Sequence, residues 1–386
     1  MGKDVRVELE LTDDQEIFAG ATRRFLEESV PVTELRARRA DPVGFDSDYW
    51  RQGAELGWTS LLASEADGGG SISDREMSDL GLLAFEFGRT AAPGPLVENN
   101  VVVSAVSRLG TDGQKAGVLE GLLSGELLAS WCFAEPAPHD RLGSITLAAT
   151  ASGDGWVLNG RKQPVESADQ SSWFLVVAMA PEGLTQFLVP ADAPGVTVTA
   201  LGGVDLTRRF STVRFDGVAV GASMLLGELG GAAYEVEHEL EVSLVAELGQ
   251  MVGSMEKAFE MTVEWAFNRY SFGRPLASYQ ALKHRFADMK IWLEASHALL
   301  DDAAAAVQEG NEDAARLVSA AKAYVGWFGP TLAQDCVQLH GGIGVTFEHD
   351  LHLYLRRIVL GSQLYGTVAD HRARLTQILE DREAKS

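Results

Sequence analysis

Cysteine, positive charge and long apolar stretches are all scarce in this chain of 386 residues. The two cysteines, Cys132 and Cys336, are too few for a disulfide scaffold or a thiolate zinc site, and they suit a reducing compartment. Lysine and arginine number 32 against 55 acidic residues, which leaves a formal net charge of −23. Duplex nucleic acid is bound through a basic surface and anionic membranes repel acidic proteins, so we expect neither as a partner.

No run approaches the roughly 20 apolar residues of a membrane-spanning helix, and the charged segment before Thr12 lacks the apolar core of a secretory signal. The eight histidines show no metal-ligand spacing such as H-E-x-x-H, so no metal site is expected. Neither a P-loop nor a G-x-S-x-G elbow is present. These absences predict a cytoplasmic protein, and the length predicts two or three packed units.

The hydrophobic pattern changes its period along the chain. From about Thr12 to Gly125 it is helical, and Thr12-Asp-Asp-Gln15 has the form of a capping box in front of the helical run Gln15–Glu28. From residue 127 to about residue 228, short segments separated by turns predict β-strands, among them 144–151, 156–160 and 174–179.

Beyond Ala232 the pattern is helical again. Long apolar-striped segments with short connections predict an antiparallel bundle. They are Tyr234–Arg269, Ser278–Glu309, Glu312–His340 and a last stretch ending near Arg382. We therefore expect three domains, at 1–126, 127–230 and 231–386, in the order helices, sheet, helices.

Two strings in the C-terminal part are the most specific in the chain. The first is Arg269-Tyr-Ser-Phe-Gly-Arg-Pro-Leu-Ala-Ser-Tyr-Gln280, followed by Ala-Asp-Met at 287–289, and the second is Gln338-Leu-His-Gly-Gly-Ile-Gly344. They resemble two signatures of the acyl-CoA dehydrogenase family, R-x-x-F-G-x-x-x-x-x-x-Q…A-D-M and Q-x-x-G-G-x-G. The likeness extends over nearly the whole chain.

This resemblance implies an α+β fold with an N-terminal helical domain, a central β-barrel-like domain and a C-terminal four-helix bundle. It also implies FAD as cofactor, an acyl-CoA thioester as substrate and an electron-transfer flavoprotein as electron acceptor. The reaction of the family removes the α-proton with a carboxylate and passes the β-hydrogen to the flavin as hydride.

The residue types in the two strings suit an anionic ligand. Arg269 lies where a helix ends, so its guanidinium can reach a phosphate, and glycines let backbone N–H groups approach an anion closely. In the family these groups bind the ADP half of a flavin that lies mainly in a neighbouring subunit. The resemblance thus assigns the following residues to FAD: Arg269, Ser271, Phe272, Gln280, Gln338, Gly341, Gly342 and Thr367. Each string alone would also suit a surface ion-pairing arginine or a helix C-cap.

The catalytic glutamate of the family is replaced in this sequence. It precedes a Gly-Thr pair in relatives, where this chain has Tyr365, and tyrosine, with an ordinary pKa of about 10, is a poor base for an α-proton. The position that some members use instead falls on Ser243, which cannot serve as a base. One helical turn further on, Glu247 lies among apolar neighbours and is an alternative base. It is also compatible with a glutamate packed at a helix–helix contact, or with the acidic run at 235–241.

The β domain also departs from the family at positions that face the flavin. Relatives have T-E-P-G-A-G-S-D where this chain has Ala134–Arg141, with His139 and Asp140 in place of a glycine and a serine. Relatives have W-I-T or W-I-S where this chain has Pro164 and Glu166, and a carboxylate there would oppose an electron-rich reduced flavin. The elements that face the chain's own flavin are altered, while those that reach a neighbour's flavin are kept.

This asymmetry predicts a heteromer, in which a paralogous subunit supplies the catalytic glutamate, the flavin-covering β domain and most of the substrate pocket. Together with the string at 348–357, it resembles the glutamate-lacking subunit of the α2β2 acyl-CoA dehydrogenases of bacterial steroid side-chain degradation. Two alternatives remain open. One is a self-sufficient homo-oligomer with Glu247 as base, and the other is a flavin-free scaffold subunit.

Overall fold

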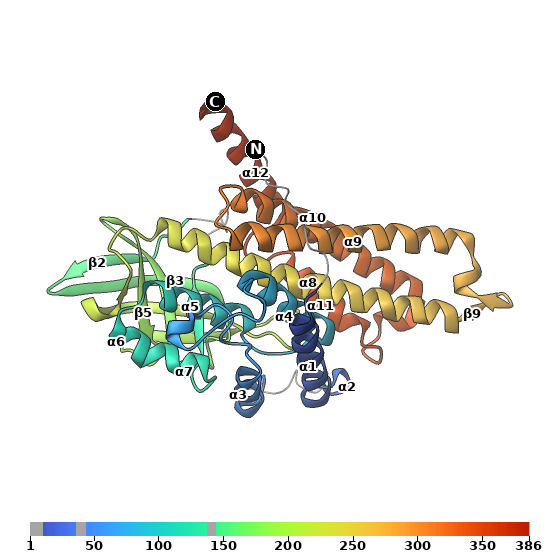
Figure 1. Ribbon diagram of the computed structural model, residues 1–386, viewed down its shortest axis with the longest axis horizontal. Coiled ribbons are helices and arrows are strands. Elements are labelled where there is room, and N and C mark those ends of the chain that lie inside the picture. The colour runs from blue at the N-terminus through green and yellow to red at the C-terminus, as the bar shows by residue number, and fades with distance from the viewer. Residues whose placement is uncertain (1–10, 36–43, 137–143, 386) are drawn as a thin grey trace.

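The structure, a computed structural model, describes residues 11–35, 44–136 and 144–385. A β-sheet lies at one end of the molecule, and long helices run from it to a tip at the opposite end (Figure 1). The predicted α+β fold is confirmed, with an N-terminal helical part, a central sheet and a C-terminal helical part.

The first N-terminal helix begins at a cap that the sequence encodes. At the start of α1, Thr12 Oγ1 accepts a hydrogen bond from the Gln15 N–H at 3.2 Å, and Gln15 Oε1 accepts one from the Thr12 N–H at 3.1 Å. The predicted capping box is therefore confirmed. The helices of this part are α1 (Asp13–Ser29), α2 (Val32–Leu35), α3 (Ser47–Glu55), α4 (Glu76–Thr90), α5 (Leu96–Leu109), α6 (Asp112–Gln114) and α7 (Glu120–Leu123).

The central sheet is mixed and has the strand order β6-β7-β3-β2-β4-β5-β8. β1 and β2 both pair in parallel with β4, and the other neighbours along the path are antiparallel. The strands are β1 (Ala129–Cys132), β2 (Ala148–Ser152), β3 (Gly155–Glu166), β4 (Trp173–Ala180), β5 (Gly183–Pro190), β6 (Val196–Leu201), β7 (Phe210–Gly221) and β8 (Leu225–Leu226).

The strand β4 explains why the sequence at 174–179 is apolar without alternation. Phe174 and Val176 belong to a core that the sheet forms by itself. Leu175 and Val177 belong to the main core, which the sheet shares with the helices. Because both faces of β4 are buried, every position along it is apolar.

The strand β3 is longer than the sequence predicts. It runs to Glu166, although the predicted segment ends at residue 160. Lys162 in this extension is fully buried, where its Nζ donates to Glu135 Oε1 at 2.8 Å. A buried lysine with a distant acidic partner carries no alternating signal, so the extension was not recognisable from its neighbours.

The C-terminal part is built on α8 (Ala233–Asn268), which packs against α4, α9, α10 and α11. A small hairpin, β9 (Tyr270–Ser271) and β10 (Arg274–Pro275), joins α8 to α9 at the tip (Figure 1). The last predicted stretch is two helices, because Tyr365 and Gly366 between them have φ of 52° and 97°. The remaining helices are α9 (Gln280–Gln308), α10 (Ala314–His340), α11 (Leu351–Gly361) and α12 (Val368–Lys385). Within the described residues, no helix is both long enough and apolar enough to cross a bilayer.

Glycines allow α4 and α8 to cross at backbone contact. A Cβ at Gly253 of α8 would lie 2.0 Å from the carbonyl oxygen of Phe85, and one at Gly88 of α4 would lie 2.1 Å from that of Gln250. Ser254 Oγ also donates to the Gly88 carbonyl at 3.0 Å. This contact holds α8 against the N-terminal helices and thereby sets where its polar residues lie.

We expect Gly253→Ala to destabilise the protein by about 1–3 kcal/mol, because the added methyl must displace the backbone of α4. Gly117→Ala is the matched control, since a Cβ there meets no atom within 4 Å and alanine favours helix. Chemical denaturation with an unchanged m-value measures both effects. Equal stability of the two variants would contradict the proposed backbone contact.

Candidate functional site

The residues that the resemblance assigns to FAD lie in two places. All except Thr367 lie at the tip, where α8 ends, α9 begins and α10 ends. Arg269 caps α8, Gln280 is the first residue of α9 and Gln338 lies in the last turn of α10, and all three side chains are exposed. Segments far apart in the sequence thus form one exposed polar surface.

The hairpin at the tip holds Phe272 away from the rest of the chain. Phe272 and Gly273 occupy the turn with φ of 49° and 82°. Tyr279 braces the turn, because its hydroxyl donates to the Ser271 carbonyl at 2.7 Å and its ring lies 3.9 Å from the Arg274 guanidinium carbon. Phe272 is 97% exposed. An aromatic side chain presented in this way favours coverage by another molecule.

A series of ring contacts connects the two specific strings. The Arg269 guanidinium carbon lies 5.8 Å from the Trp265 ring centre, and Trp265 stacks on His340 with ring centroids 5.2 Å apart. His340 is itself anchored by a 2.8 Å hydrogen bond between Nδ1 and the Cys336 carbonyl. Arg269 and the glycine turn after His340 therefore belong to one packed unit.

The glycine turn leaves room for a ligand. Gly341 ends α10 with φ of 68°, so it does act as the C-cap, and no described atom lies within 4 Å of a Cβ built at Gly341 or Gly342. An exposed guanidinium, amide side chains and an open glycine backbone are groups that suit a pyrophosphate. The tip therefore fits the ADP half of FAD.

The positions connected with the catalytic base lie far from the tip. On α8, Glu247 and Arg269 are separated by about 33 Å along the helix axis at 1.5 Å per residue. Glu247 is fully buried, as its apolar neighbours in the sequence predict. The end of α8 near the sheet and the end at the tip therefore cannot contact the same small group.

Arg208, in the loop between β6 and β7, joins Glu247 to Glu166. Its Nη1 donates to both carboxylate oxygens of Glu247 at 2.9 Å, while Nε and Nη2 donate to those of Glu166 at 2.8 and 2.6 Å. The three side chains are at most 2% exposed. If Glu247 accepted a substrate proton, it would lose its charge-assisted bonds in a buried pair, and Arg208 would lose one of its two counter-charges.

Tyr365 is engaged in the same region. Its hydroxyl donates to Glu98 Oε1 at 2.9 Å, and the other Glu98 oxygen accepts the Trp131 N–H at 2.9 Å. Burial raises the pKa of Glu98 to about 8, and the negative charge of Glu166 adds to this effect. Burial also raises the pKa of Tyr365 well above its ordinary value, and the negative charge of Glu98 raises it further. Tyr365 is thus unsuited to remove a proton at neutral pH.

The remaining sequence candidates have structural partners or lie elsewhere. Ser243 is buried and its hydroxyl donates to the backbone carbonyl one turn earlier at 2.8 Å. Thr367 caps α12, because its Oγ1 donates to Asp370 Oδ2 at 2.7 Å and accepts the Asp370 N–H at 3.3 Å. His139 and Asp140 lie outside the described residues.

Arg208, Glu166, Glu247, Glu98, Tyr365 and Lys322 form the buried cluster. Three of these residues, Arg208, Glu98 and Lys322, could not be recognised from the sequence. Arg208 lies 39 residues from Glu247 and 42 from Glu166, so no short motif marks the pairs. Lys322 on α10 donates through Nζ to the Gly361 carbonyl, and burial lowers its pKa to about 8. The cluster exists only where the sheet, α5, α8 and α10 meet.

Three family models together match nearly the whole chain. They describe the acyl-CoA dehydrogenase N-terminal domain at residues 12–126, the middle domain at 130–218 and the C-terminal domain at 233–379. The chain therefore belongs to the acyl-CoA dehydrogenase family, whose members are oxidoreductases that act on CH–CH bonds.

One of the similar solved structures is named as a steroid enzyme, and another is named as a complex. The acyl-CoA dehydrogenase IpdE2 of Mycobacterium tuberculosis is 29% identical over 340 residues, which cover 86% of each chain. A variant of the steroid acyl-CoA dehydrogenase Tcur3481–Tcur3483 has a TM-score of 0.87 at 28% identity, covering 96% of this chain and 99% of that one. The ChsE4–ChsE5 complex of Mycobacterium tuberculosis shares the fold, with a TM-score of 0.87 at 24% identity over 96% and 98% of the two chains.

We expect Arg208→Gln to lower the free energy of unfolding by about 3–5 kcal/mol, because it removes the cation that bonds both buried carboxylates. Arg214→Gln is the control, since Arg214 pairs with Asp216 at 3.1 Å and both side chains are about two-thirds exposed. That change should cost less than about 1 kcal/mol. Denaturant midpoints compare the two, and a small effect of both would show that the Arg208 pairs contribute little.

The raised pKa of Glu98 predicts a pH dependence of stability. Since the folded-state pKa of about 8 exceeds the ordinary value of 4.5, the folded chain keeps a proton that the unfolded chain releases between these values. Stability contributed by this group is therefore present below pH 4.5 and is lost as the pH rises towards 8, with a slope of about −1.4 kcal/mol per pH unit.

Glu98→Gln keeps the hydrogen-bonding shape without a titrating proton. The free energy of unfolding, plotted against pH between about 5.5 and 7.5, should therefore fall less steeply for the variant, by about 1.4 kcal/mol per pH unit. Glu239→Gln should act in the same direction, because burial raises the pKa of Glu239 to about 8 as well. The prediction would be contradicted if the free energy of unfolding of Glu98→Gln and of the unaltered protein changed with pH at the same slope.

Proposed function

We propose that this chain is the subunit of a heteromeric, FAD-dependent acyl-CoA dehydrogenase that does not donate the catalytic base. The observation that carries the proposal is the buried fork of Arg208 on Glu166 and Glu247. It occupies the region where the sheet meets α8, while the anion-binding groups of the tip remain exposed. A paralogous partner subunit supplies the catalytic glutamate and the flavin-covering β domain.

The chain's own residues have a defined share in this arrangement. Arg269, Gln280, Gln338 and the Gly341–Gly342 backbone hold the ADP half of FAD at the tip. Ser271 and Phe272 of the hairpin lie against the partner. FAD, when bound, supplies the acceptor for the hydride that leaves the β-carbon of the acyl thioester. Because Arg269 lies about 33 Å from Glu247 along α8, this group of residues serves a flavin held mainly by another chain.

The relatives support a steroid side-chain CoA ester as substrate. IpdE2 and the Tcur3481–Tcur3483 steroid enzyme are similar to this chain over most of its length. The ChsE4–ChsE5 structure is named as a complex, which supports an α2β2 assembly of unlike subunits. We further propose that the enzyme works in the cytoplasm and passes its electrons to an electron-transfer flavoprotein. Both free cysteines are buried, in keeping with a reducing compartment.

The two alternative functions are a self-sufficient homo-oligomer and a flavin-free scaffold subunit. In a self-sufficient homo-oligomer, Glu247 would have to release Arg208 in each turnover, which the fully buried pair disfavours. In a flavin-free scaffold, the exposed groups of the tip would have no ligand. The scaffold function therefore does not explain why the glycine turn is open and Phe272 is exposed.

The proposal predicts a colourless lone chain and a yellow complex with about one flavin for every two chains after co-expression with the paralogous subunit. Arg269→Ala in this chain should weaken FAD binding by the complex about tenfold or more, because a charge-assisted bond to the pyrophosphate is lost. Arg161→Ala is the control, since Arg161 is exposed on β3 and should leave the flavin content unchanged. Absorbance at flavin wavelengths and equilibrium dialysis give both quantities.

The same preparations decide between the alternatives. One flavin per lone chain, with turnover that Glu247→Gln abolishes, would establish the self-sufficient enzyme. An intact complex whose flavin content does not respond to Arg269→Ala would establish the scaffold.

A further inference from the structure

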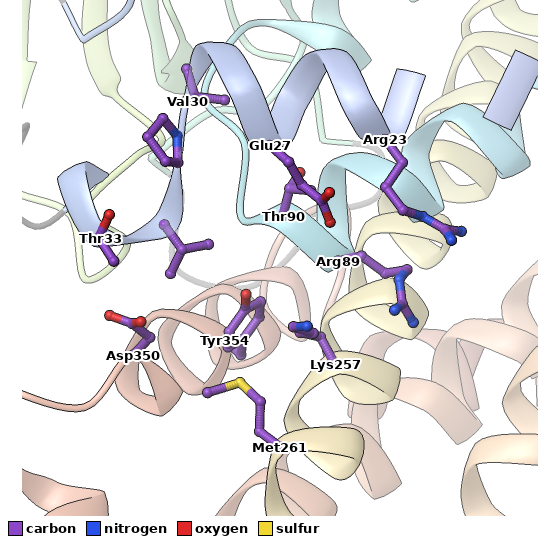
Figure 2. Close-up of a pocket in the computed structure, with 12 residues that line it drawn as sticks. Arg23, Glu27, Val30, Thr33, Arg89, Thr90, Lys257, Met261, Asp350 and Tyr354 are labelled. Carbon is purple, nitrogen blue, oxygen red and sulfur yellow. The ribbon is translucent and has the colours of Figure 1, made fainter. Parts of the chain in front are cut away.

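A cavity of about 350 Å³ lies apart from both the tip and the buried cluster (Figure 2). It opens between α1, the end of α4, the middle of α8 and the start of α11. Val30, Pro31 and Val32 after α1 form an apolar side of the cavity, and Met261 of α8 adds an apolar group across from Val30, beside Lys257 (Figure 2). Its volume is in the range of small-molecule sites, which is roughly 300–1,000 Å³.

The opposite side carries two donors. Lys257 of α8 is half-buried and forms no ion pair with any residue that the structure describes. Tyr354 of α11 is 1% exposed, and its hydroxyl points across the cavity towards α1 (Figure 2). No hydrogen bond joins this hydroxyl to a described residue, and burial raises the pKa of Tyr354, so the group remains a donor at neutral pH.

The other charges that line the cavity are already paired or lie at its rim. Arg23 donates through Nε and Nη2 to Glu86, and Arg89 donates through Nη1 and Nη2 to Glu260. Glu27 is exposed, so water screens its charge. Among the described residues that line the cavity, the Lys257 ammonium is consequently the cation that is available to a ligand.

A second acidic group, Asp350, lies at the start of α11 near Tyr354 (Figure 2). It has a partner of its own within the chain. Besides the exposed Thr33 hydroxyl, the described donors that face a ligand are the Lys257 ammonium and the Tyr354 hydroxyl, which match the two oxygens of a monoanion better than the several oxygens and higher charge of a phosphate.

We propose that this cavity binds a small organic carboxylate, with its carboxylate on Lys257 Nζ and Tyr354 Oη and its apolar chain against Val30, Pro31 and Met261. The formal net charge of −23 repels anions from the molecule as a whole, so a carboxylate requires a local cation of this kind. This site does not depend on the proposed function, because it uses none of the residues assigned to FAD or to the buried cluster.

Calorimetric titration of the purified chain with hexanoate at low ionic strength tests the proposal. We expect saturable binding of one hexanoate per chain, weakened about tenfold or more by Lys257→Gln and weakened less by Tyr354→Phe. Lys283→Gln is the matched control, since Lys283 is an exposed lysine on α9 and its loss should leave binding unchanged. Hexan-1-ol and hexylamine should show no saturable binding.

A second variant separates loss of binding from loss of folding. Met261→Trp keeps every charge, but the larger side chain fills the apolar part of the cavity that the hexanoate chain would occupy. It should therefore abolish hexanoate binding while thermal unfolding remains cooperative. The proposal is overturned if the unaltered chain does not bind hexanoate, if hexylamine binds equally well, or if folded Lys257→Gln or Met261→Trp binds hexanoate as tightly as the unaltered chain.

Discussion

Arg208 forms ion pairs with Glu166 of the sheet and Glu247 of α8 in the buried centre of the molecule, and the relation between the sheet and the bundle depends on these pairs. Removing three charged groups from water is costly, and the cost is offset only where geometry and hydrogen bonding are nearly complete. Here each carboxylate receives two hydrogen bonds from the guanidinium. The region is therefore filled by the chain's own charges.

The buried pairs also constrain their neighbours. A Cβ at Gly361 of α11 would lie 2.5 Å from Glu247 Oε1, and Lys322 donates to the Gly361 carbonyl. Within the buried cluster, Tyr365 and Glu98 form their own hydrogen bond between the end of the chain and α5. A buried polar network of this kind specifies one arrangement of the elements, since any other would leave a charge without a partner.

Distance along α8 separates two kinds of chemistry in one chain. Its first half is buried among carboxylates, an arginine and a lysine, whereas its far end presents Arg269 beside a glycine turn and an exposed Phe272. The helix is held in place by backbone contact with α4 at Gly253. A rigid helix of this length cannot bring both ends to one small group, which supports the proposal that the tip serves a flavin held by another subunit.

Local regularities of the sequence determined the fold class, the order of helices and sheet, the Thr12 cap and the two strings that carry the family. They did so because helix periodicity, capping and short motifs depend on residues within a few positions of one another. The sequence also placed Glu247 in an apolar setting and Tyr365 at the position of the family's base. Only the tertiary structure decided that Arg208 engages Glu247, that Tyr365 bonds Glu98 across 267 residues and that Trp265 stacks on His340. The first two pairs join different domains and the third joins two helices of one domain, and an ion pair or ring contact between distant segments leaves no periodic trace in either of them.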